Sequence, residues 1–328
     1  MTKISIIGAG AWGTALANII SAKGKKTFLY ARNASLTDEI NATHENKRYL
    51  TSIPLNKNLI ATSEISEALQ NEIIMLVTPA QAMRKTLTQI KPLIRPEHIL
   101  ILCAKGLEKG STLRMSEIAS EILPNTSLAI LSGPNFAHDV AQGKPAATTL
   151  ATKRQNNSQY IQEVIATSTF RPYLSTDIIG VEIAGALKNV IAIACGIAHG
   201  MNMGESARAS LITRGLAEIS RLGIKMGAQN DTFLGLSGVG DMLLTCSSTQ
   251  SRNFSLGTAL GQGQSLKEIL NARSSVTEGV HTAESANALA QKYDVDLPIC
   301  QAIHKCINEE YPLDAMLQEM LNRPLKHE

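Results

Sequence analysis

The chain of 328 residues is long enough to bury two hydrophobic cores, and its composition predicts a soluble globular protein. Hydrophobic residues make up 44% and charged residues 18%, which excludes a disordered chain. The formal net charge is only +3 and no block of lysine and arginine stands out, so we expect no nucleic-acid partner. We also expect no stable membrane insertion, because no segment joins membrane length to an unbroken apolar span.

Strand-like and helix-like segments alternate through the first half of the chain. Residues 3–7 predict a strand, residues 12–23 a helix, and residues 26–30 a second strand. Further strands are expected at 72–77, 98–104, 127–131, 146–152 and 170–174, with a helix from about residue 112. Nearly continuous apolar strands in such an alternation predict a parallel sheet with helices on both faces.

The second half of the chain is helical after Ser175-Thr176-Asp177, a sequence typical of a helix N-cap. Helical patterns follow at about 178–198, 206–226, 229–234, 253–261, 282–292 and 299–310. We therefore predict an α/β protein with a doubly wound, mostly parallel sheet domain over residues 1–177. An all-α domain is expected over residues 178–328.

A glycine-rich sequence, Gly8-Ala9-Gly10-Ala11-Trp12-Gly13, lies between the first predicted strand and helix. In a Rossmann-like unit the first glycine allows a tight turn and the second lets the backbone approach a pyrophosphate. The third glycine allows close helix–strand packing, and the N–H groups of the helix face the anion. The motif in this context predicts dinucleotide binding through Gly8, Gly10 and Gly13.

The end of the second strand indicates which dinucleotide binds. NAD-binding chains usually place an acidic residue there for the ribose 2′-hydroxyl, but this chain has Arg32 and no acid. A guanidinium can pair with a 2′-phosphate or stack on the adenine, and the alternative is a solvated loop arginine. We expect NADP(H) to be preferred, with NAD(H) as the second choice.

Lys188 is the only charge in the apolar, helix-like run from Ile183 to Gly196. A buried ammonium group must be paired, reach solvent, or have a lowered pKa. A pKa lowered toward neutrality would suit a general acid or base. The alternative is a lysine near the helix start whose stem carries the charge to water.

Three further motifs suit ligand binding. Lys105 and the turn at 131–137 follow predicted parallel strands, whose carboxyl ends form the ligand-binding edge. Asp241 follows a glycine-rich segment and is either a helix N-cap or a buried carboxylate. The segment 250–253 places a guanidinium beside an amide, which suits a phosphate or a carboxylate.

Together these motifs resemble the bacterial NAD(P)-dependent glycerol-3-phosphate dehydrogenases, which reduce dihydroxyacetone phosphate for phospholipid synthesis. The matching segments occur in family order at 7–17, 104–108, 132–137, 185–192, 212–218, 238–246, 250–253 and 276–279. Each segment alone is unspecific, but the set is highly specific. Ala11 and Asn135 depart from the residues usual in the family, and we interpret both as tuning.

The resemblance implies a role for individual residues. Lys188 matches the catalytic lysine, with Lys105 and Asp241 as its partners at the reacting carbonyl. The implied substrate contacts are Lys105, Gly133, Asn135, Lys188, Asp241, Ser251, Arg252 and Asn253. The implied cofactor contacts are Gly8, Gly10, Ala11, Trp12, Gly13, Arg32, Lys105, Ala137, Arg252, Val276 and Glu278.

The implied reaction is hydride transfer from nicotinamide to C2 of dihydroxyacetone phosphate, giving sn-glycerol 3-phosphate. Lys188 would donate the proton, and Arg252 with Asn253 would hold the phosphate. The resemblance also suggests a homodimer. Two alternatives are a dehydrogenase for a hydroxy acid or acyl thioester and a non-catalytic dinucleotide sensor.

The five cysteines are odd in number and widely spread, which predicts reduced thiols in a cytoplasmic protein. Cys300, His304 and Cys306 are close in sequence, but they do not complete a tetrahedral ligand set. We interpret them as helix packing and expect no metal.

Overall fold

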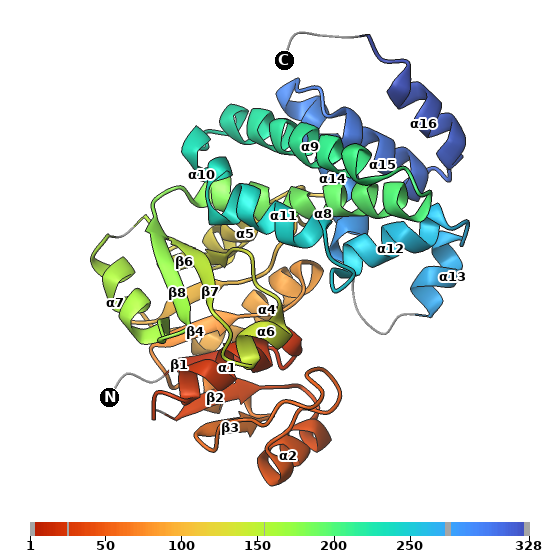
Figure 1. Cartoon of the computed structure of the whole chain (residues 1–328). Coiled ribbons are helices and arrows are strands. Elements are labelled where there is room, and N and C mark those ends of the chain that lie inside the picture. The colour runs from red at the N-terminus through yellow and green to blue at the C-terminus, as the bar shows by residue number, and fades with distance from the viewer. Residues whose placement is uncertain (1–3, 25, 154, 273–276, 325–328) are drawn as a thin grey trace. The chain divides into compact units, whose positions relative to one another are not determined.

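A computed structural model describes residues 4–24, 26–153, 155–272 and 277–324 of the chain (Figure 1). The described residues form two compact units. The first unit contains the chain up to Lys105 and from Arg114 to Val181, and the second contains Gly106–Leu113 and the chain from Glu182 onward. The short segment Gly106–Leu113 thus packs with a distant part of the chain, and an ion pair of 3.1 Å joins Lys109 to Glu284.

The first unit is built on an eight-stranded sheet in the order β3-β2-β1-β4-β5-β6-β7-β8. The strands are β1 (Ile4–Ile7), β2 (Thr27–Tyr30), β3 (Leu59–Thr62), β4 (Ile73–Leu76), β5 (Ile99–Leu102), β6 (Ser127–Ser132), β7 (Ala146–Ala151) and β8 (Phe170–Ser175). Strands β1 to β6 are parallel, β7 pairs antiparallel with β6, and β8 runs parallel to β7. The predicted mostly parallel, Rossmann-like sheet is confirmed.

The strand sequences explain this topology. Every residue of β1, β4 and β5 is buried, as expected for central strands covered on both faces. The helices of this unit are α1 (Ala11–Ser21), α2 (Ala34–Thr43), α3 (Ile65–Ala68), α4 (Met83–Ile90), α5 (Met115–Ile122), α6 (Ala137–Ala141) and α7 (Gln155–Ile165), with short turns η1 (Ala80–Ala82) and η2 (Lys91–Leu93). Helix α5 begins at Met115, three residues later than predicted, and β3 and α2 were not predicted.

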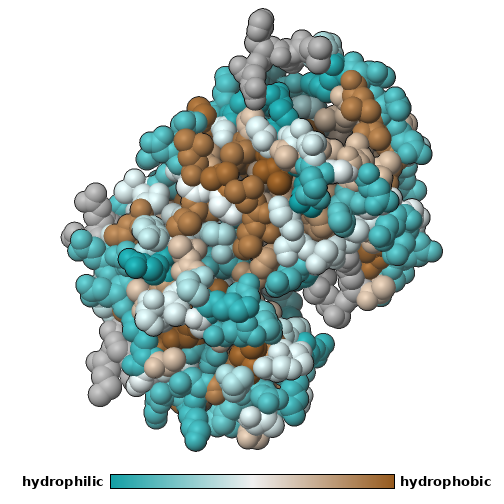
Figure 2. Space-filling view, viewed as in Figure 1, coloured by the Kyte–Doolittle hydropathy of each residue, from teal (hydrophilic) through white to brown (hydrophobic). Residues whose placement is uncertain are grey.

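The second unit is helical in the part of the chain that the structure describes. Its helices are α8 (Ile178–Gly200, which starts in the first unit), α9 (Glu205–Lys225), α10 (Asn230–Leu234), α11 (Asp241–Cys246), α12 (Arg252–Gly261), α13 (Leu266–Asn271), α14 (Glu278–Tyr293), α15 (Pro298–Asn308) and α16 (Leu313–Leu321), and η3 (Leu236–Gly240) is a π-helical turn. The predicted all-α character is confirmed, while α13 and α16 were not predicted. Figure 2 shows apolar surface over α10 and α11, where Leu234 is 66% and Leu243 is 50% exposed.

Helix α8 is the longest helix among the described residues and is largely apolar. Its start is capped by Asp177, whose Oδ1 accepts the N–H of Gly180 at 2.9 Å, so the predicted N-cap is confirmed. By length and composition alone α8 is able to cross a membrane, although Glu182 and Lys188 interrupt its apolar sequence. However, 94% of its most apolar window is buried inside the protein, as in a core helix.

Helices α8 and α12 contact each other at glycine residues. A Cβ atom added to Gly196 would lie 2.1 Å from the carbonyl oxygen of Phe254, and one added to Gly257 would lie 2.1 Å from that of Ile193. Such distances are far below van der Waals contact, so the two backbones pack directly against each other. This contact fixes α12 against the helix that carries Lys188.

Strand β8 lies at one edge of the sheet. Pro172, in the middle of β8, pairs in register with Thr148 of β7. The carbonyl oxygen of Pro172 accepts a hydrogen bond of 2.7 Å from the side-chain amide of Gln162, on α7. The neighbouring Arg171 and Tyr173 are exposed.

Candidate active site

The glycine-rich turn lies at the carboxyl end of β1. A Cβ atom on Gly8, whose φ is +118°, would lie 2.5 Å from the carbonyl oxygen of Val77, and one on Gly13 would lie 1.9 Å from that of Gly8. Both positions therefore require glycine. At Gly10, which precedes α1, a Cβ atom would meet nothing within 4 Å. Open space beside Gly10, at the start of α1, fits the close approach of a pyrophosphate.

The strand order reverses between β1 and β4, because the chain builds β2 and β3 on one side of β1 and β4 to β6 on the other. Dinucleotides bind across the crevice outside the carboxyl ends of the strands at such a point. Ala11 and Trp12 begin α1, and Ala137 begins α6. Arg32 follows β2 and is exposed. Val276 lies outside the described residues.

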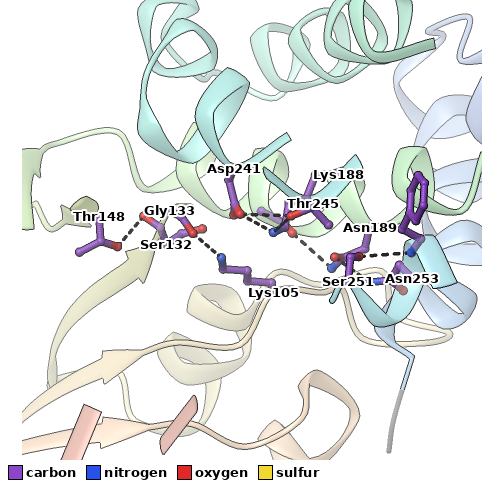
Figure 3. Close-up of polar contacts among 12 residues, drawn as sticks. Lys105, Ser132, Gly133, Thr148, Lys188, Asn189, Asp241, Thr245, Ser251 and Asn253 are labelled. Carbon is purple, nitrogen blue, oxygen red and sulfur yellow. Dashed lines mark hydrogen bonds and ion pairs between the residues drawn. The ribbon is translucent and has the colours of Figure 1, made fainter. Parts of the chain in front are cut away.

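Lys105 is held at the carboxyl end of β5. Its Nζ donates a hydrogen bond of 2.8 Å to the carbonyl oxygen of Gly133, which follows β6 (Figure 3). The turn after β6 is in turn fixed by Thr148, whose hydroxyl donates to the carbonyl oxygen of Ser132 at 3.0 Å. Asn135 lies in the same turn, and its Oδ1 is buried without a hydrogen-bond partner among the described residues. A cation and an unsatisfied amide oxygen thus lie on the neighbouring loops that follow the carboxyl ends of β5 and β6.

Lys188 forms a buried ion pair in the second unit. Its Nζ lies 2.5 Å from Oδ1 of Asp241 and 2.7 Å from the hydroxyl of Thr245 (Figure 3). Lys188 is 6% and Asp241 is 1% exposed. The ammonium group therefore does not reach water along its stem. Pairing is what allows the charge to stay inside an apolar helix.

Asp241 is a buried carboxylate and not a helix N-cap. It is the first residue of α11, which directly follows the π-helical turn η3, and no side chain caps α11. The segment Leu236–Gly240 is interrupted by a kink at Gly238, whose backbone angles (φ −92°, ψ −106°) are not helical, so the predicted glycine-rich turn lies within it. Asp241 follows this kink directly, and its Oδ1 accepts a hydrogen bond from Nζ of Lys188 on α8.

Two polar residues of this cluster were missed in the sequence. The Thr245 hydroxyl lies 3.4 Å from Oδ1 of Asp241, and the two residues are four positions apart on α11. That spacing puts both side chains on one helix face, so it was a usable signal. Asn189 follows Lys188 directly, but nothing in the sequence indicated its partner.

The amide of Asn253, on α12, connects three helices. The Nδ2 of Asn253 donates to Oδ1 of Asn189 at 2.9 Å, and the N–H of Gly279 donates to Oδ1 of Asn253 at 3.0 Å (Figure 3). Ser251 caps α12, because its hydroxyl accepts the N–H of Phe254 at 3.2 Å. Arg252 begins α12 and is exposed, and Glu278 begins α14. The network ties the start of α12 and of α14 to α8.

The thiols of the chain are all free, and two of them, Cys246 and Cys300, are near buried charges. Burial, together with the neighbouring Cys195, raises the pKa of Cys246 well above its usual value. Burial also raises the pKa of Cys300, near Glu218. These thiols stay protonated at neutral pH. Within the described ranges no group of three or more His, Cys, Asp or Glu could hold a metal ion.

Glu218 is a second buried carboxylate of the helical unit, 1% exposed. Its two oxygens accept the N–H groups of Ile299 at 2.7 Å and Cys300 at 3.2 Å, at the start of α15. Burial raises the pKa of Glu218 to about 7, although both backbone hydrogen bonds lower it.

This shift predicts that the helical unit loses stability as the pH rises. The folded state keeps the Glu218 proton up to about pH 7 while the unfolded chain loses it near 4.5. The stabilisation is fully present below pH 4.5 and is lost as the pH passes 7, by about 3 kcal/mol in total. Urea unfolding between pH 5 and pH 8 measures the slope of the free energy of unfolding against pH. Glu218→Gln should flatten it, whereas Glu163→Gln, at an exposed site, should not; an unchanged slope in Glu218→Gln contradicts the assignment.

Comparison with known proteins places the chain in a family. Residues 3–158 and 177–318 match the family models for the N-terminus and the C-terminus of NAD-dependent glycerol-3-phosphate dehydrogenase. A glycerol-3-phosphate dehydrogenase [NAD(P)+] of Rhodospirillum rubrum is 49% identical over 326 residues, 99% of this chain and 93% of the relative. One from Caulobacter vibrioides is 45% identical over 99% of this chain and 98% of its own length.

Solved structures agree with the sequence comparisons. The crystal structure of glycerol-3-phosphate dehydrogenase from Coxiella burnetii matches with a TM-score of 0.94 and 38% identity, over 98% of this chain and 99% of that one. A glycerol-3-phosphate dehydrogenase of Saccharomyces cerevisiae matches with a TM-score of 0.84 and 26% identity, over 98% and 99% of the two chains. Both halves of the chain and its whole length are covered, so the chain belongs to the NAD-dependent glycerol-3-phosphate dehydrogenase family.

Proposed function

We propose that the chain catalyses the NAD(P)H-dependent reduction of dihydroxyacetone phosphate to sn-glycerol 3-phosphate, a reversible hydride transfer at C2. The buried Lys188–Asp241 pair, in a chain of this family, carries the proposal. Bound NAD(P)H supplies the hydride, and Lys188 holds a proton at Nζ for the oxygen of the reduced carbonyl. Asp241 and Thr245 fix the position of Nζ.

The other proposed substrate contacts supply positive charge and orientation. Lys105, oriented by its bond to Gly133, stabilises negative charge that develops on the carbonyl oxygen. Arg252, with the N-terminus of α12 behind it, binds the phosphate, and Asn135, Ser251 and Asn253 complete the substrate contacts. Binding energy at the phosphate aligns the carbonyl for reaction.

We assign the first domain (1–177) to the cofactor and the second (178–328) to the substrate. The cofactor contacts are Gly8, Gly10, Ala11, Trp12, Gly13, Arg32, Lys105, Ala137, Arg252, Val276 and Glu278. The product would supply phospholipid synthesis in the cytoplasm, in line with the free thiols. The exposed apolar surface at Leu234 and Leu243 supports a homodimer.

A spectrophotometric assay tests the proposed reaction. Purified protein should oxidise NADPH when dihydroxyacetone phosphate is added, and far more slowly with unphosphorylated dihydroxyacetone. Turnover on a hydroxy acid or acyl thioester, without turnover on dihydroxyacetone phosphate, would instead favour a different dehydrogenase. Cofactor binding with no turnover on any phosphorylated ketone would indicate a dinucleotide sensor.

Arg32 should set the preference for NADP(H). Replacing it with alanine removes the guanidinium at the end of β2, so we expect the KM for NADPH to rise about tenfold while the KM for NADH stays within twofold. Steady-state kinetics with both cofactors measures the ratio. Lys57→Ala, an exposed cation before β3, should change neither value. An equal rise for both cofactors in Arg32→Ala would contradict a role at the 2′-phosphate.

A further inference from the structure

The hydroxyl of Thr78 is buried without a hydrogen-bond partner among the described residues. Thr78 follows β4 by two positions and lies beside the glycine-rich turn. The N–H of Val77 donates to the carbonyl oxygen of Ile7 at 2.9 Å, and a Cβ atom on Gly8 would lie 3.5 Å from the backbone nitrogen of Thr78. The residue as a whole is only partly buried, although its Oγ1 is buried in this rotamer.

Other threonines of the same unit do have partners. The Thr14 hydroxyl donates to the carbonyl oxygen of Ala9, that of Thr62 donates to Glu67, and that of Thr148 donates to the carbonyl oxygen of Ser132. A hydroxyl buried without a partner destabilises the protein relative to a methyl group of the same shape. An unsatisfied hydroxyl at the ligand-binding edge therefore points to a partner on a ligand.

The sheet topology indicates which part of the dinucleotide is the partner. A doubly wound sheet consists of two mononucleotide-binding halves that meet where the strand order reverses. Arg32 follows β2, in the half made of β1 to β3, and is assigned to the adenine-side ribose. Thr78 follows β4, the first strand of the other half. The nicotinamide half of the cofactor is therefore expected at the half of the sheet that begins with β4.

We propose that the Thr78 hydroxyl hydrogen-bonds an oxygen of the nicotinamide-side ribose phosphate of NAD(P)H. This inference rests on the proposed cofactor site. Rotation about χ1 moves the hydroxyl between staggered positions without moving the backbone. The hydroxyl adds affinity for the intact dinucleotide and none for its adenine half.

Thr78→Val is the direct test, because valine has the same shape and lacks the hydroxyl. The dissociation constants of NADPH and of 2′,5′-ADP, which contains only the adenine half, are measured by calorimetry without substrate. We expect NADPH to bind about tenfold more weakly to the variant, equivalent to 1.4 kcal/mol. The affinity for 2′,5′-ADP should stay within twofold of wild type. The melting temperature of the ligand-free variant should equal or exceed that of wild type.

Thr152→Val is the matched control. Its hydroxyl donates to the carbonyl oxygen of Leu128 at 2.9 Å, after β7, which runs opposite to β4. Loss of this bond should lower the melting temperature and leave NADPH affinity unchanged. The two threonines should thus respond in opposite ways, one in ligand affinity and the other in stability.

Three results would overturn the inference. They are unchanged NADPH affinity in Thr78→Val, an equal loss of affinity for NADPH and 2′,5′-ADP, or a fall in ligand-free melting temperature as large as that of Thr152→Val. Failure of the wild-type protein to bind NADPH or NADH is a separate outcome, because it would overturn the cofactor site itself.

Discussion

Replacement of Lys188 by methionine is expected to lower kcat about a thousandfold, because the variant has no proton to give to the carbonyl oxygen. Stability should also fall, by about 3 kcal/mol, since Asp241 is 1% exposed and loses the partner that lies 2.5 Å away. Kinetics under saturating cofactor and urea unfolding measure the two effects. Turnover within tenfold of wild type would show that Lys188 is not the proton donor.

A double variant separates the two effects of this change. Lys188→Met combined with Asp241→Asn leaves no charge in the cluster, so much of the lost stability should return. Activity should not return, because the amide of asparagine is no proton donor. Recovery of kcat in the double variant would mean that the single variant was inactive through misfolding and that the assigned chemistry is wrong.

Replacement of Gly257 by alanine is expected to cost about 3 kcal/mol of stability or more. The added Cβ atom would lie 2.1 Å from the carbonyl oxygen of Ile193, and backbone atoms of a packed helix have no room to move away. Helix α12 would shift from α8, so we also expect a higher KM for dihydroxyacetone phosphate. Thermal unfolding and steady-state kinetics measure both.

Gly235→Ala is the control for this experiment. A Cβ atom at Gly235 would meet its nearest neighbour, the carbonyl oxygen of Thr232, at 3.4 Å, and its φ of −91° suits any residue. The stability of Gly235→Ala should therefore stay within about 1 kcal/mol of wild type. Wild-type stability in Gly257→Ala would show that the two helices tolerate separation.

Periodicity predicted the elements that are long or wholly apolar. Helix α8 and the central strands stand out because burial on all sides leaves a largely apolar run. Strand β3 is no shorter than β1 or β4, but it ends at the polar Thr62 and follows a polar loop, so its apolar pattern is too short to detect. The antiparallel direction of β7 has no local signal, since it depends on pairing with β6.

The site was predictable in its residue types but not in its contacts. The apolar sequence around Lys188 required a partner for the charge, and the family resemblance suggested Asp241. The two residues are 53 positions apart, the sequence between them carries no pairing signal, and only the folded chain shows the distance. Unsatisfied oxygens such as that of Thr78 are invisible in a sequence, because satisfaction depends on every neighbour.

The edge strand β8 has a consequence for behaviour at high concentration. In a strand the backbone N and the carbonyl oxygen of one residue point to the same side. At Pro172 the outward side therefore has no N–H donor, and its carbonyl oxygen already accepts a hydrogen bond from Gln162. The charge of Arg171 beside it further opposes the approach of a second strand. Although Tyr173 and Leu174 are exposed, Pro172 interrupts the ladder of hydrogen bonds that another strand would form along this edge. The β8 edge of the sheet is thereby protected against edge-to-edge polymerisation.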